Sequence, residues 1–421
     1  MSYSLPTALG PVVGSARVPG SKSATNRALV LASLAETPGT IRGALSSRDT
    51  SLMISALRQF GVAIAHLDDG TLVVTPPAQL VGGGTVDCGL AGTVMRFVPP
   101  IALLAGQPTR FTGDPQARER PMAGLLAALR QLGARIDGNK IPFTVQPGQI
   151  EAASTVTLDS SASSQFISGL LLVAARLPGG LDIIHNGPAI PSLPHITMTM
   201  RFLRNWGVQV DADEATSWSV APQRIVANDF AVEPDLTNAS VFLAAALATG
   251  GRVTIPDWPQ DSAQPGNFFV TLAQDFGGQI EARPDGLTIQ GPAQLRPVDF
   301  DLHSASELAP VVAALAALAP GTSRIRGIAH SRGHETDRIA ALATEINRIG
   351  AQAEEQPDGL LIRGTDQPQA AEPLQTYADH RLAHFAAIVA LRANDLAVND
   401  ISCVSKTMPD FMSRWRALVG G

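Results

Sequence analysis

The chain has few of the residues that mark secreted, membrane or nucleic-acid-binding proteins. Its 421 residues contain two cysteines, Cys88 and Cys403, so no disulfide framework is expected and a reducing cytoplasm is the simplest location. No apolar stretch approaches the roughly 20 residues of a membrane span, and the first residues lack the basic and apolar pattern of a secretion leader. The net charge of −6 argues against nucleic acid or an acidic membrane as a partner.

What the chain does contain is a pattern that recurs about every 70 residues. Each repeat has a polar segment, a helix of small apolar residues, a glycine or proline stop, a short strand and an amphipathic helix. The six polar segments are 20–23, 89–93, 160–165, 235–238, 303–307 and 377–381. Each is expected to begin a helix, where unpaired backbone N–H groups and the helix dipole favour an anion. A repeated fold allows several such helix ends to face one anionic ligand.

Glycines follow the amphipathic helices at nearly constant intervals. Gly61, Gly133, Gly207, Gly277 and Gly350 lie 72, 74, 70 and 73 residues apart, and each is expected to cap a helix C-terminus. The pattern predicts an α/β protein of six βαβαββ-like units, three in each half, rather than one doubly wound sheet. Short crossings between the halves would act as a hinge, and the cleft between them is the default site.

The first polar segment has residues that suit anions. Residues 19–27 combine a glycine turn, hydroxyl groups, Lys22 and Arg27, which suits a phosphate together with a carboxylate. The segment lacks the spacing of a nucleotide-binding phosphate loop. Taken alone, it is better explained as a capped helix with solvated basic residues, and the charges of the 113–122 loop are better explained as surface salt bridges.

A later segment, residues 334–338, is more distinctive. A histidine, two acids and an arginine crowd one loop-to-helix junction, where Thr336 or Asp337 would serve as the N-cap. His330 and His334 are four residues apart, which raises the possibility of a metal pair. Gly333 lies between them and no third ligand is close in sequence, so no metal site is expected.

Together these segments resemble the 5-enolpyruvylshikimate-3-phosphate synthase family over essentially the whole chain. The matching segments are 19–27, 91–96, 119–121, 163–166, 335–338, 379–381 and 405–407 with 409–410. The resemblance implies two similar domains, each of three βαβαββ units, in the inside-out α/β barrel of the enolpyruvyl transferase fold. The expected domains are residues 1–19 with 234–421 and residues 20–233, with the active site in the cleft between them.

The resemblance also implies a reaction and a set of residues. The enolpyruvyl group of phosphoenolpyruvate is transferred to the 5-hydroxyl of shikimate 3-phosphate and phosphate is released, a step toward chorismate and the aromatic amino acids. The family is the target of glyphosate, a mimic of phosphoenolpyruvate. Proton transfer falls to Lys22, Glu307 and Glu335. Shikimate 3-phosphate binding falls to Lys22, Ser23, Arg27, Ser163, Ser164, Gln165, Ser192, Glu307 and His334. Phosphoenolpyruvate binding falls to Lys22, Gly92, Arg120, Gln165, Arg338, Arg381 and Lys406.

The chemistry explains why these residue types are needed. The two substrates bring close to six negative charges into one pocket at neutral pH. Guanidinium forks suit carboxylate and phosphate oxygens, so an otherwise acidic chain must gather its arginines locally. No cofactor or metal is required, and we expect a cytoplasmic monomer.

Several positions depart from the usual pattern of the family. The replacements, with the usual residue in brackets, are Leu90 (asparagine), Phe97 (proline), His195 (tyrosine), Glu307 (aspartate), His330 (asparagine) and His334 (lysine). Leu90 removes one polar contact to phosphoenolpyruvate. If His334 takes the role of the lysine, phosphate binding should weaken as rising pH removes its proton.

Two alternatives remain open at this point. The sister enolpyruvyl transferase that acts on UDP-N-acetylglucosamine shares the fold and the donor, but it usually carries a cysteine in the loop that corresponds to residues 113–121, where this chain has none. A non-catalytic anion-binding scaffold is the second alternative. The joint presence of Lys22, Glu307, Glu335, Arg338 and Lys406 speaks against it.

Overall fold

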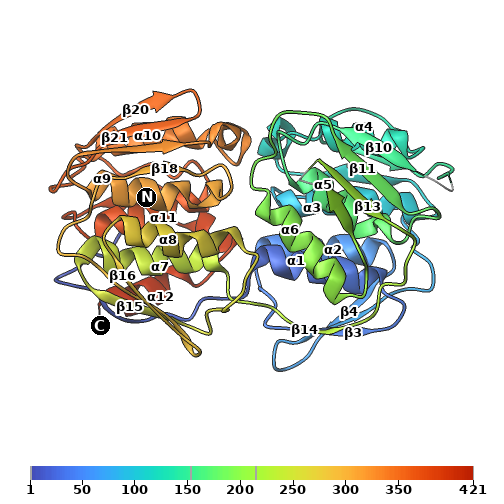
Figure 1. Cartoon of the computed structure of the whole chain (residues 1–421), viewed down its shortest axis with the longest axis horizontal. Helices are drawn as coiled ribbons and strands as arrows, with labels where there is room; N and C mark the ends of the chain where they lie inside the picture. The colour runs from blue at the N-terminus through green and yellow to red at the C-terminus, as the bar shows by residue number, and fades with distance from the viewer. Residues whose placement is uncertain (1, 152–153, 214–215, 421) are drawn as a thin grey trace. The chain divides into compact units, whose positions relative to one another are not determined.

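The computed structural model describes residues 2–151, 154–213 and 216–420 (Figure 1). They divide into two compact units, which we call the inserted domain (Gly20–Val232) and the terminal domain (Met1–Pro19 with Glu233–Gly421). Each domain contains three repeats. A full repeat has a first strand, a buried helix, a second strand parallel to the first, an amphipathic helix and an antiparallel hairpin, and one of the six repeats is reduced. This βαβαββ arrangement is the one that the sequence predicts.

The inserted domain follows this plan closely. Its first repeat is α1 (Lys22–Leu34), β3 (Gly39–Arg42), α2 (Arg48–Gln59), β4 (Ala63–His66) and β5 (Leu72–Thr75). The second is β6 (Thr85–Asp87), α3 (Gly92–Ile101), the 3-10 turn η1 (Ala102–Leu104), β7 (Thr109–Thr112), the 3-10 turn η2 (Pro115–Glu119), α4 (Ala123–Gln131), β8 (Arg135–Ile136) and β9 (Phe143–Gln146). The third is β10 (Thr155–Leu158), α5 (Gln165–Ala174), β11 (Leu181–His185), α6 (Pro194–Asn205), β12 (Asp211–Asp213) and β13 (Ser217–Val220), and β14 (Asp229–Ala231) follows it.

The terminal domain has two full repeats and one reduced repeat. The first is β2 (Val13–Ser15), α7 (Leu236–Thr249), β15 (Arg252–Pro256), the 3-10 turn η3 (Pro265–Phe268), α8 (Phe269–Asp275), β16 (Gln279–Arg283) and β17 (Gly286–Gln290). The second is β18 (Asp299–Asp301), the 3-10 turn η4 (Ser306–Leu308), α9 (Ala309–Leu318), β19 (Thr322–Arg326), the 3-10 turn η5 (Ala329–Gly333), α10 (Arg338–Arg348), β20 (Gln352–Gln356) and β21 (Gly359–Arg363). The reduced one is β1 (Tyr3–Ser4), α11 (His380–Ala390), β22 (Ala397–Val398), the 3-10 turn η6 (Ser402–Lys406) and α12 (Phe411–Val419).

Two of the sheets are completed by a strand that lies far from their other strands in sequence. Within the described residues, five sheets have four strands and the sixth, β1 with β22, has two. The first repeat of the inserted domain lacks a first strand of its own, and β14 pairs parallel to β3 in its place, with Phe230 opposite Ile41. Similarly, β2 pairs parallel to β15 in the terminal domain, with Gly14 opposite Val253. Each of these strands therefore completes a repeat whose helices lie far away in sequence.

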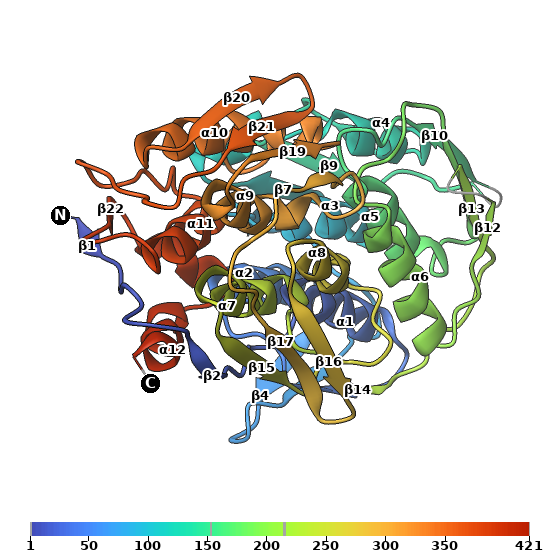
Figure 2. The same cartoon turned by 60° about the vertical axis from the view of Figure 1, so that its left-hand side comes forward.

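The cores are built from the helices that open the repeats. In the inserted domain α1, α3 and α5 pack on one another, and in the terminal domain α7, α9 and α11 do the same (Figures 1 and 2). All residues of α9 are buried, because small apolar side chains cover every side of the helix. The amphipathic helices keep one polar face. The sheets lie outside these central helices, which makes each domain an inside-out α/β fold.

The helix ends agree with the glycine prediction. Gly61, Gly133, Gly207, Gly277 and Gly350 all adopt positive φ, between 79° and 101°, directly after the amphipathic helices. One predicted helix start differs: the 303–307 segment leads into η4, which begins at Ser306, and α9 begins only at Ala309. Pro310 has no N–H with which to bond the Ser306 carbonyl, so a 3-10 turn precedes the helix instead.

Candidate active site

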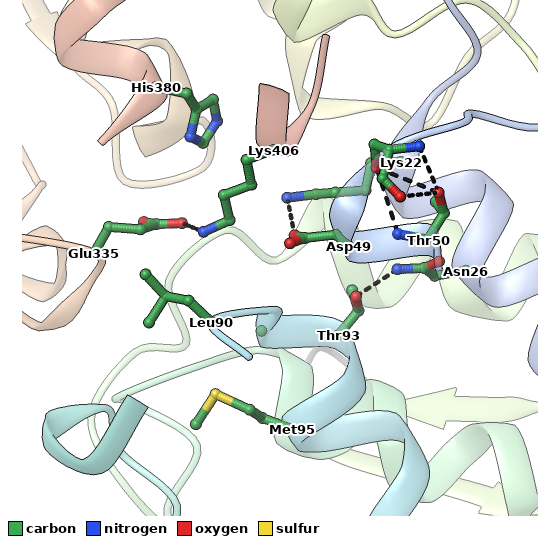
Figure 3. Close-up of polar contacts among 12 residues, drawn as sticks. Lys22, Asn26, Asp49, Thr50, Leu90, Thr93, Met95, Glu335, His380 and Lys406 are labelled. Carbon is green, nitrogen blue, oxygen red and sulfur yellow. Dashed lines mark hydrogen bonds and ion pairs between the residues drawn. The ribbon is translucent and has the colours of Figure 1, made fainter. Parts of the chain in front are cut away.

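Lys22 is the first residue of α1 and follows the N-cap Ser21, whose side chain accepts a hydrogen bond from the Ala24 N–H. Its Nζ lies 3.1 Å from Oδ2 of Asp49, a carboxylate buried at the start of α2 (Figure 3). The capping box formed by Ser47 and Thr50 fixes this helix start. The ammonium group is therefore oriented by an ion pair between two helix N-termini.

Arg27 is buried among neutral partners. Its Nε donates to Thr199 Oγ1 at 2.8 Å, Nη1 to the Ser23 carbonyl at 3.1 Å and Nη2 to the His195 carbonyl at 3.0 Å. Its guanidinium carbon lies 5.1 Å from the centre of the Phe97 ring. Burial lowers the pKa of Arg27 to about 9. A buried cation with neutral partners of this kind is stabilised when an anionic ligand binds.

Three residues predicted to bind phosphoenolpyruvate converge at the start of α3. A Cβ added to Gly92 would lie 3.1 Å from Arg120 Nη2 and 3.1 Å from Gln165 Oε1. Nη1 of Arg120 donates to the Leu90 carbonyl at 3.0 Å. Among the residues that the structure describes, Arg120 Nε and Gln165 Oε1 are buried without a hydrogen-bond partner. A donor, an acceptor and a helix N-terminus without a side chain thus face the same small space.

The serines predicted to bind shikimate 3-phosphate lie on two loops of the inserted domain. Ser163 and Ser164 precede α5, and Ser163 Oγ accepts the Gln165 N–H at 3.3 Å. Ser192 precedes α6 in the left-handed conformation, with φ of 50°, and its carbonyl accepts the His195 N–H at 3.0 Å. Ser164 and Ser192 are buried.

The predicted residues of the terminal domain form an ionic cluster around Arg338. Arg338 Nε lies 2.7 Å from Asp379 Oδ2, Nη2 lies 2.8 Å from Glu335 Oε2 and Nη1 lies 2.9 Å from His334 Nδ1. Burial works against the charge of Arg338, but Asp379 and Glu335 outweigh it, so its pKa lies above the ordinary value. Arg338 is therefore held by two carboxylates, in contrast to Arg27.

Lys406 and Arg381 complete the set of cations in this domain. Lys406 Nζ pairs with Glu335 Oε1 (Figure 3), and Arg381 Nη1 donates to the backbone carbonyl of Glu307 at 3.0 Å. Burial, followed by the charge of Arg338, lowers the pKa of Arg381. Asp379 caps α11 by accepting the Arg381 backbone N–H at 2.9 Å, so the carboxylate that pairs with Arg338 also fixes the helix start that carries Arg381.

The two histidines at unusual positions are held as neutral groups. His330 Nε2 lies 2.8 Å from Ser306 Oγ, and burial lowers the pKa of His330 to about 4. Because Arg338 can only donate, His334 Nδ1 must carry a lone pair in this arrangement. The described residues contain no cluster of three or more metal-ligating side chains.

Two functional contacts were not predicted from the sequence. Asp49 pairs with Lys22, and Asp379 pairs with Arg338, 41 residues away. The sequence signal for Asp49 is weak, because an acid in the first turn of a capped helix has an ordinary explanation. Its near-complete burial, with 2% of the side chain exposed, is what sets it apart.

The fold and the buried cations of each domain define a class, the two-domain α/β proteins whose cationic groups suit small polyanionic ligands. Two solved structures of EPSP synthase from Acinetobacter baumannii share the fold, with TM-scores of 0.81 and 0.80 and 22% and 21% identity. Both alignments cover 99% of this chain and 98% of the other chain. No helix in the described part of the chain has the length and apolarity that a membrane crossing requires.

A model of the EPSP synthase family (3-phosphoshikimate 1-carboxyvinyltransferase) matches residues 6–415. The chain therefore belongs to the EPSP synthase family, whose members transfer the enolpyruvyl group from phosphoenolpyruvate to shikimate 3-phosphate. The prediction from the sequence segments is confirmed at the level of family, fold and reaction.

Proposed function

We propose that the predicted site residues perform this reaction in the roles that the resemblance assigns. The observation that carries the proposal is the convergence of Gly92, Arg120 and Gln165, which lie up to 73 residues apart in sequence. Atoms of Arg120 and Gln165 lie within 3.2 Å of the position that a Cβ on Gly92 would occupy. The resemblance assigns the same three residues to phosphoenolpyruvate. A guanidinium fork at a helix N-terminus suits a phosphate or carboxylate group.

The acceptor, shikimate 3-phosphate, is held mainly by the inserted domain in this proposal, where Lys22 also contacts it, and Glu307 and His334 of the terminal domain complete its ligands. Ser163, Ser164 and Gln165 bind its phosphate at the start of α5, and Ser23 and Ser192 bind polar groups of the ring. Arg27 supplies the positive charge for the acceptor carboxylate. Its burial among carbonyl and hydroxyl oxygens, with a pKa lowered to about 9, supports this role because a carboxylate would compensate the charge.

The donor, phosphoenolpyruvate, is held by residues of both domains. Lys22, Gly92, Arg120 and Gln165 act from the inserted domain, and Arg338, Arg381 and Lys406 act from the terminal domain. Arg338 and Lys406 now contact Glu335. The donor carboxylate competes with Glu335 for these two cations, and this exchange frees Glu335 to move a proton.

The chemical steps follow from these roles. Glu307 accepts the proton of the acceptor 5-hydroxyl, while Lys22 and Glu335 deliver a proton to carbon 3 of the donor. Carbon 2 then forms its bond to the acceptor oxygen, and the cations stabilise the tetrahedral adduct. Loss of a proton from the former carbon 3 and cleavage of the carbon–oxygen bond to phosphate complete the transfer. Asp49 keeps Lys22 oriented through this sequence.

We also propose that the protein acts as a monomer in the cytoplasm. Burial raises the pKa of Cys88 and of Cys403 to about 12, so neither thiol is a reactive group. Light scattering of the purified protein tests the monomer, because a mass other than 43.9 kDa contradicts it.

The test of the proposed function is phosphate release from phosphoenolpyruvate, measured without acceptor, with shikimate 3-phosphate and with UDP-N-acetylglucosamine. Release should occur only with shikimate 3-phosphate. Release that depends on UDP-N-acetylglucosamine would assign the sister reaction. Absence of release with either acceptor, in a protein that binds both substrates, would indicate a binding scaffold.

A further inference from the structure

We propose that His185 is a positioning residue that fixes the spacing of the two loops to which we assign shikimate 3-phosphate. The inference rests on the proposed function of these loops. His185 ends β11, the 159–165 loop carries Ser163 and Ser164, and the 186–193 loop carries Ser192. None of the segments that carry the family resemblance includes His185.

Both nitrogens of the His185 ring are engaged, one with each loop. The Ser160 N–H donates to His185 Nδ1 at 3.2 Å, and His185 Nε2 lies 2.7 Å from the Pro188 carbonyl. A backbone N–H can only donate and a carbonyl can only accept, so Nδ1 must carry the lone pair and Nε2 the proton. Only this neutral tautomer makes both bonds.

The contacts continue from His185 to the predicted phosphate ligands. Ser160 Oγ donates to the Ser163 carbonyl at 2.7 Å, and the Ser163 N–H donates to the Ser160 carbonyl at 3.0 Å. The loops also pack closely, since a Cβ on Gly187 would lie 2.1 Å from Asp159 Oδ1. A displacement of the His185 ring is therefore transmitted to Ser163 on one loop and toward Ser192 on the other.

The same geometry makes the arrangement sensitive to acid. An imidazolium has no lone pair at Nδ1, so protonation breaks the bond from Ser160. Asp159 faces His185 from the end of β10. Hydrogen bonds from Ser161 hold the pKa of Asp159 below its usual range. A second acid, Asp213, is the last residue of β12. Thr216, three residues further on, accepts the His185 backbone N–H at 2.8 Å through its carbonyl. When His185 is protonated, the Asp159 carboxylate offsets the positive charge of the ring. The protonated ring therefore adds little attraction for the phosphate group of shikimate 3-phosphate.

The first test uses three substitutions of His185. His185→Phe keeps a ring and removes both bonds, His185→Asn keeps an acceptor near Nδ1 and His185→Gln keeps a donor near Nε2. His185→Phe should raise KM for shikimate 3-phosphate about tenfold, as expected for one or two lost hydrogen bonds, and leave KM for phosphoenolpyruvate within about twofold. The other two should lie between wild type and His185→Phe. The control His66→Phe, at the exposed end of β4 in the same domain, should change neither constant.

Two results overturn the inference. One is a KM for shikimate 3-phosphate within about twofold of wild type in His185→Phe. The other is an equal rise of both KM values with loss of thermal stability, which indicates a purely structural role. If His185→Phe does not fold, His185→Asn and the pH profile decide.

The pH profile compares wild type with His185→Asn. The ratio of their KM values for shikimate 3-phosphate cancels the ionisation of the substrate phosphate, which lies near pH 6. The ratio of the wild-type KM to the His185→Asn KM should rise as the pH falls, and a ratio that stays constant or falls contradicts the inference. The double variant Ser163→Ala, Ser164→Ala tests the proposed role of the loop separately from the role of His185. If this double variant leaves KM for shikimate 3-phosphate unchanged, the proposed role of the loop fails. If it raises KM while the His185 variants do not, only the role of His185 fails.

Discussion

The two domains share one fold, but one buried arginine of each, Arg27 and Arg338, is stabilised in a different way. In the inserted domain, Arg27 is surrounded by carbonyl and hydroxyl oxygens and an aromatic ring. In the terminal domain, Arg338 contacts the carboxylates of Asp379 and Glu335. A cation with neutral partners can gain an anionic ligand without losing an ionic contact. A cation with anionic partners must release one of them when such a ligand binds. The comparison suggests that acceptor binding adds charge compensation and donor binding rearranges it.

The largest expected effect comes from two of the three proton-transfer residues, one taken from each domain. Lys22→Met and Glu307→Gln should each lower kcat by about three orders of magnitude, because each removes a group that moves a proton in the transition state. Circular dichroism and thermal unfolding should match wild type. Activity within tenfold of wild type in either variant rejects that role.

The next prediction compares how much the free energy of unfolding changes when each of the two arginines is replaced. Arg338→Gln should reduce the free energy of unfolding by about 3 to 5 kcal/mol, because it leaves the buried Asp379 carboxylate without its ionic partner. Arg27→Gln should change it by about 1 kcal/mol or less, because relief of the buried charge offsets the lost neutral hydrogen bonds. Urea unfolding of both variants measures the difference. Equal losses of stability would remove the contrast between the domains.

The third prediction concerns the loss of stability in acid that comes from buried histidines of the terminal domain. Burial lowers the pKa of His330 to about 4 and that of His384 to about 3, below the usual 6.5. The unfolded chain takes up these protons as pH falls below about 6.5, while the native protein takes them up only near pH 4 and 3. The free energy of unfolding should therefore fall by about 2 kcal/mol or more between pH 7 and pH 5. His384→Met should reduce this pH dependence, and an unchanged dependence in that variant contradicts the account.

The smallest effect is steric and lies in the inserted domain. Gly92→Ala would place a methyl group 3.1 Å from Arg120 and from Gln165, which is tighter than ordinary packing. KM for phosphoenolpyruvate should rise by about tenfold, equivalent to about 1.4 kcal/mol, with little change in KM for shikimate 3-phosphate. An unchanged KM for phosphoenolpyruvate would show that the donor does not enter this space.

Much of the fold follows from local sequence. The apolar helices, the strands after them and the glycines with positive φ occupy the predicted places, because helix capping and hydrophobic pattern are properties of short segments. The pairing of β14 with β3 and of β2 with β15 depends on tertiary contacts and has no local signal. The 3-10 start before α9 was missed because the effect of Pro310 was not considered.

The candidate site likewise contains features that the sequence predicts and features that it does not. The structure brings Gly92, Arg120 and Gln165 together. Their binding of phosphoenolpyruvate, and the roles of Lys22, Glu307 and Glu335 in proton transfer, stay predictions. The partners of Lys22 and Arg338, the buried Asp49 and Asp379, were missed because an acid in a helix N-terminal turn usually has no ionic role of this kind.

The most direct test of the contrast between the domains is the pair of KM values in Arg27→Gln. The account predicts that KM for shikimate 3-phosphate rises at least tenfold, while KM for phosphoenolpyruvate and thermal stability stay close to wild type. An equal rise of both KM values, or a loss of stability as large as that of Arg338→Gln, would contradict it and make Arg27 a structural residue.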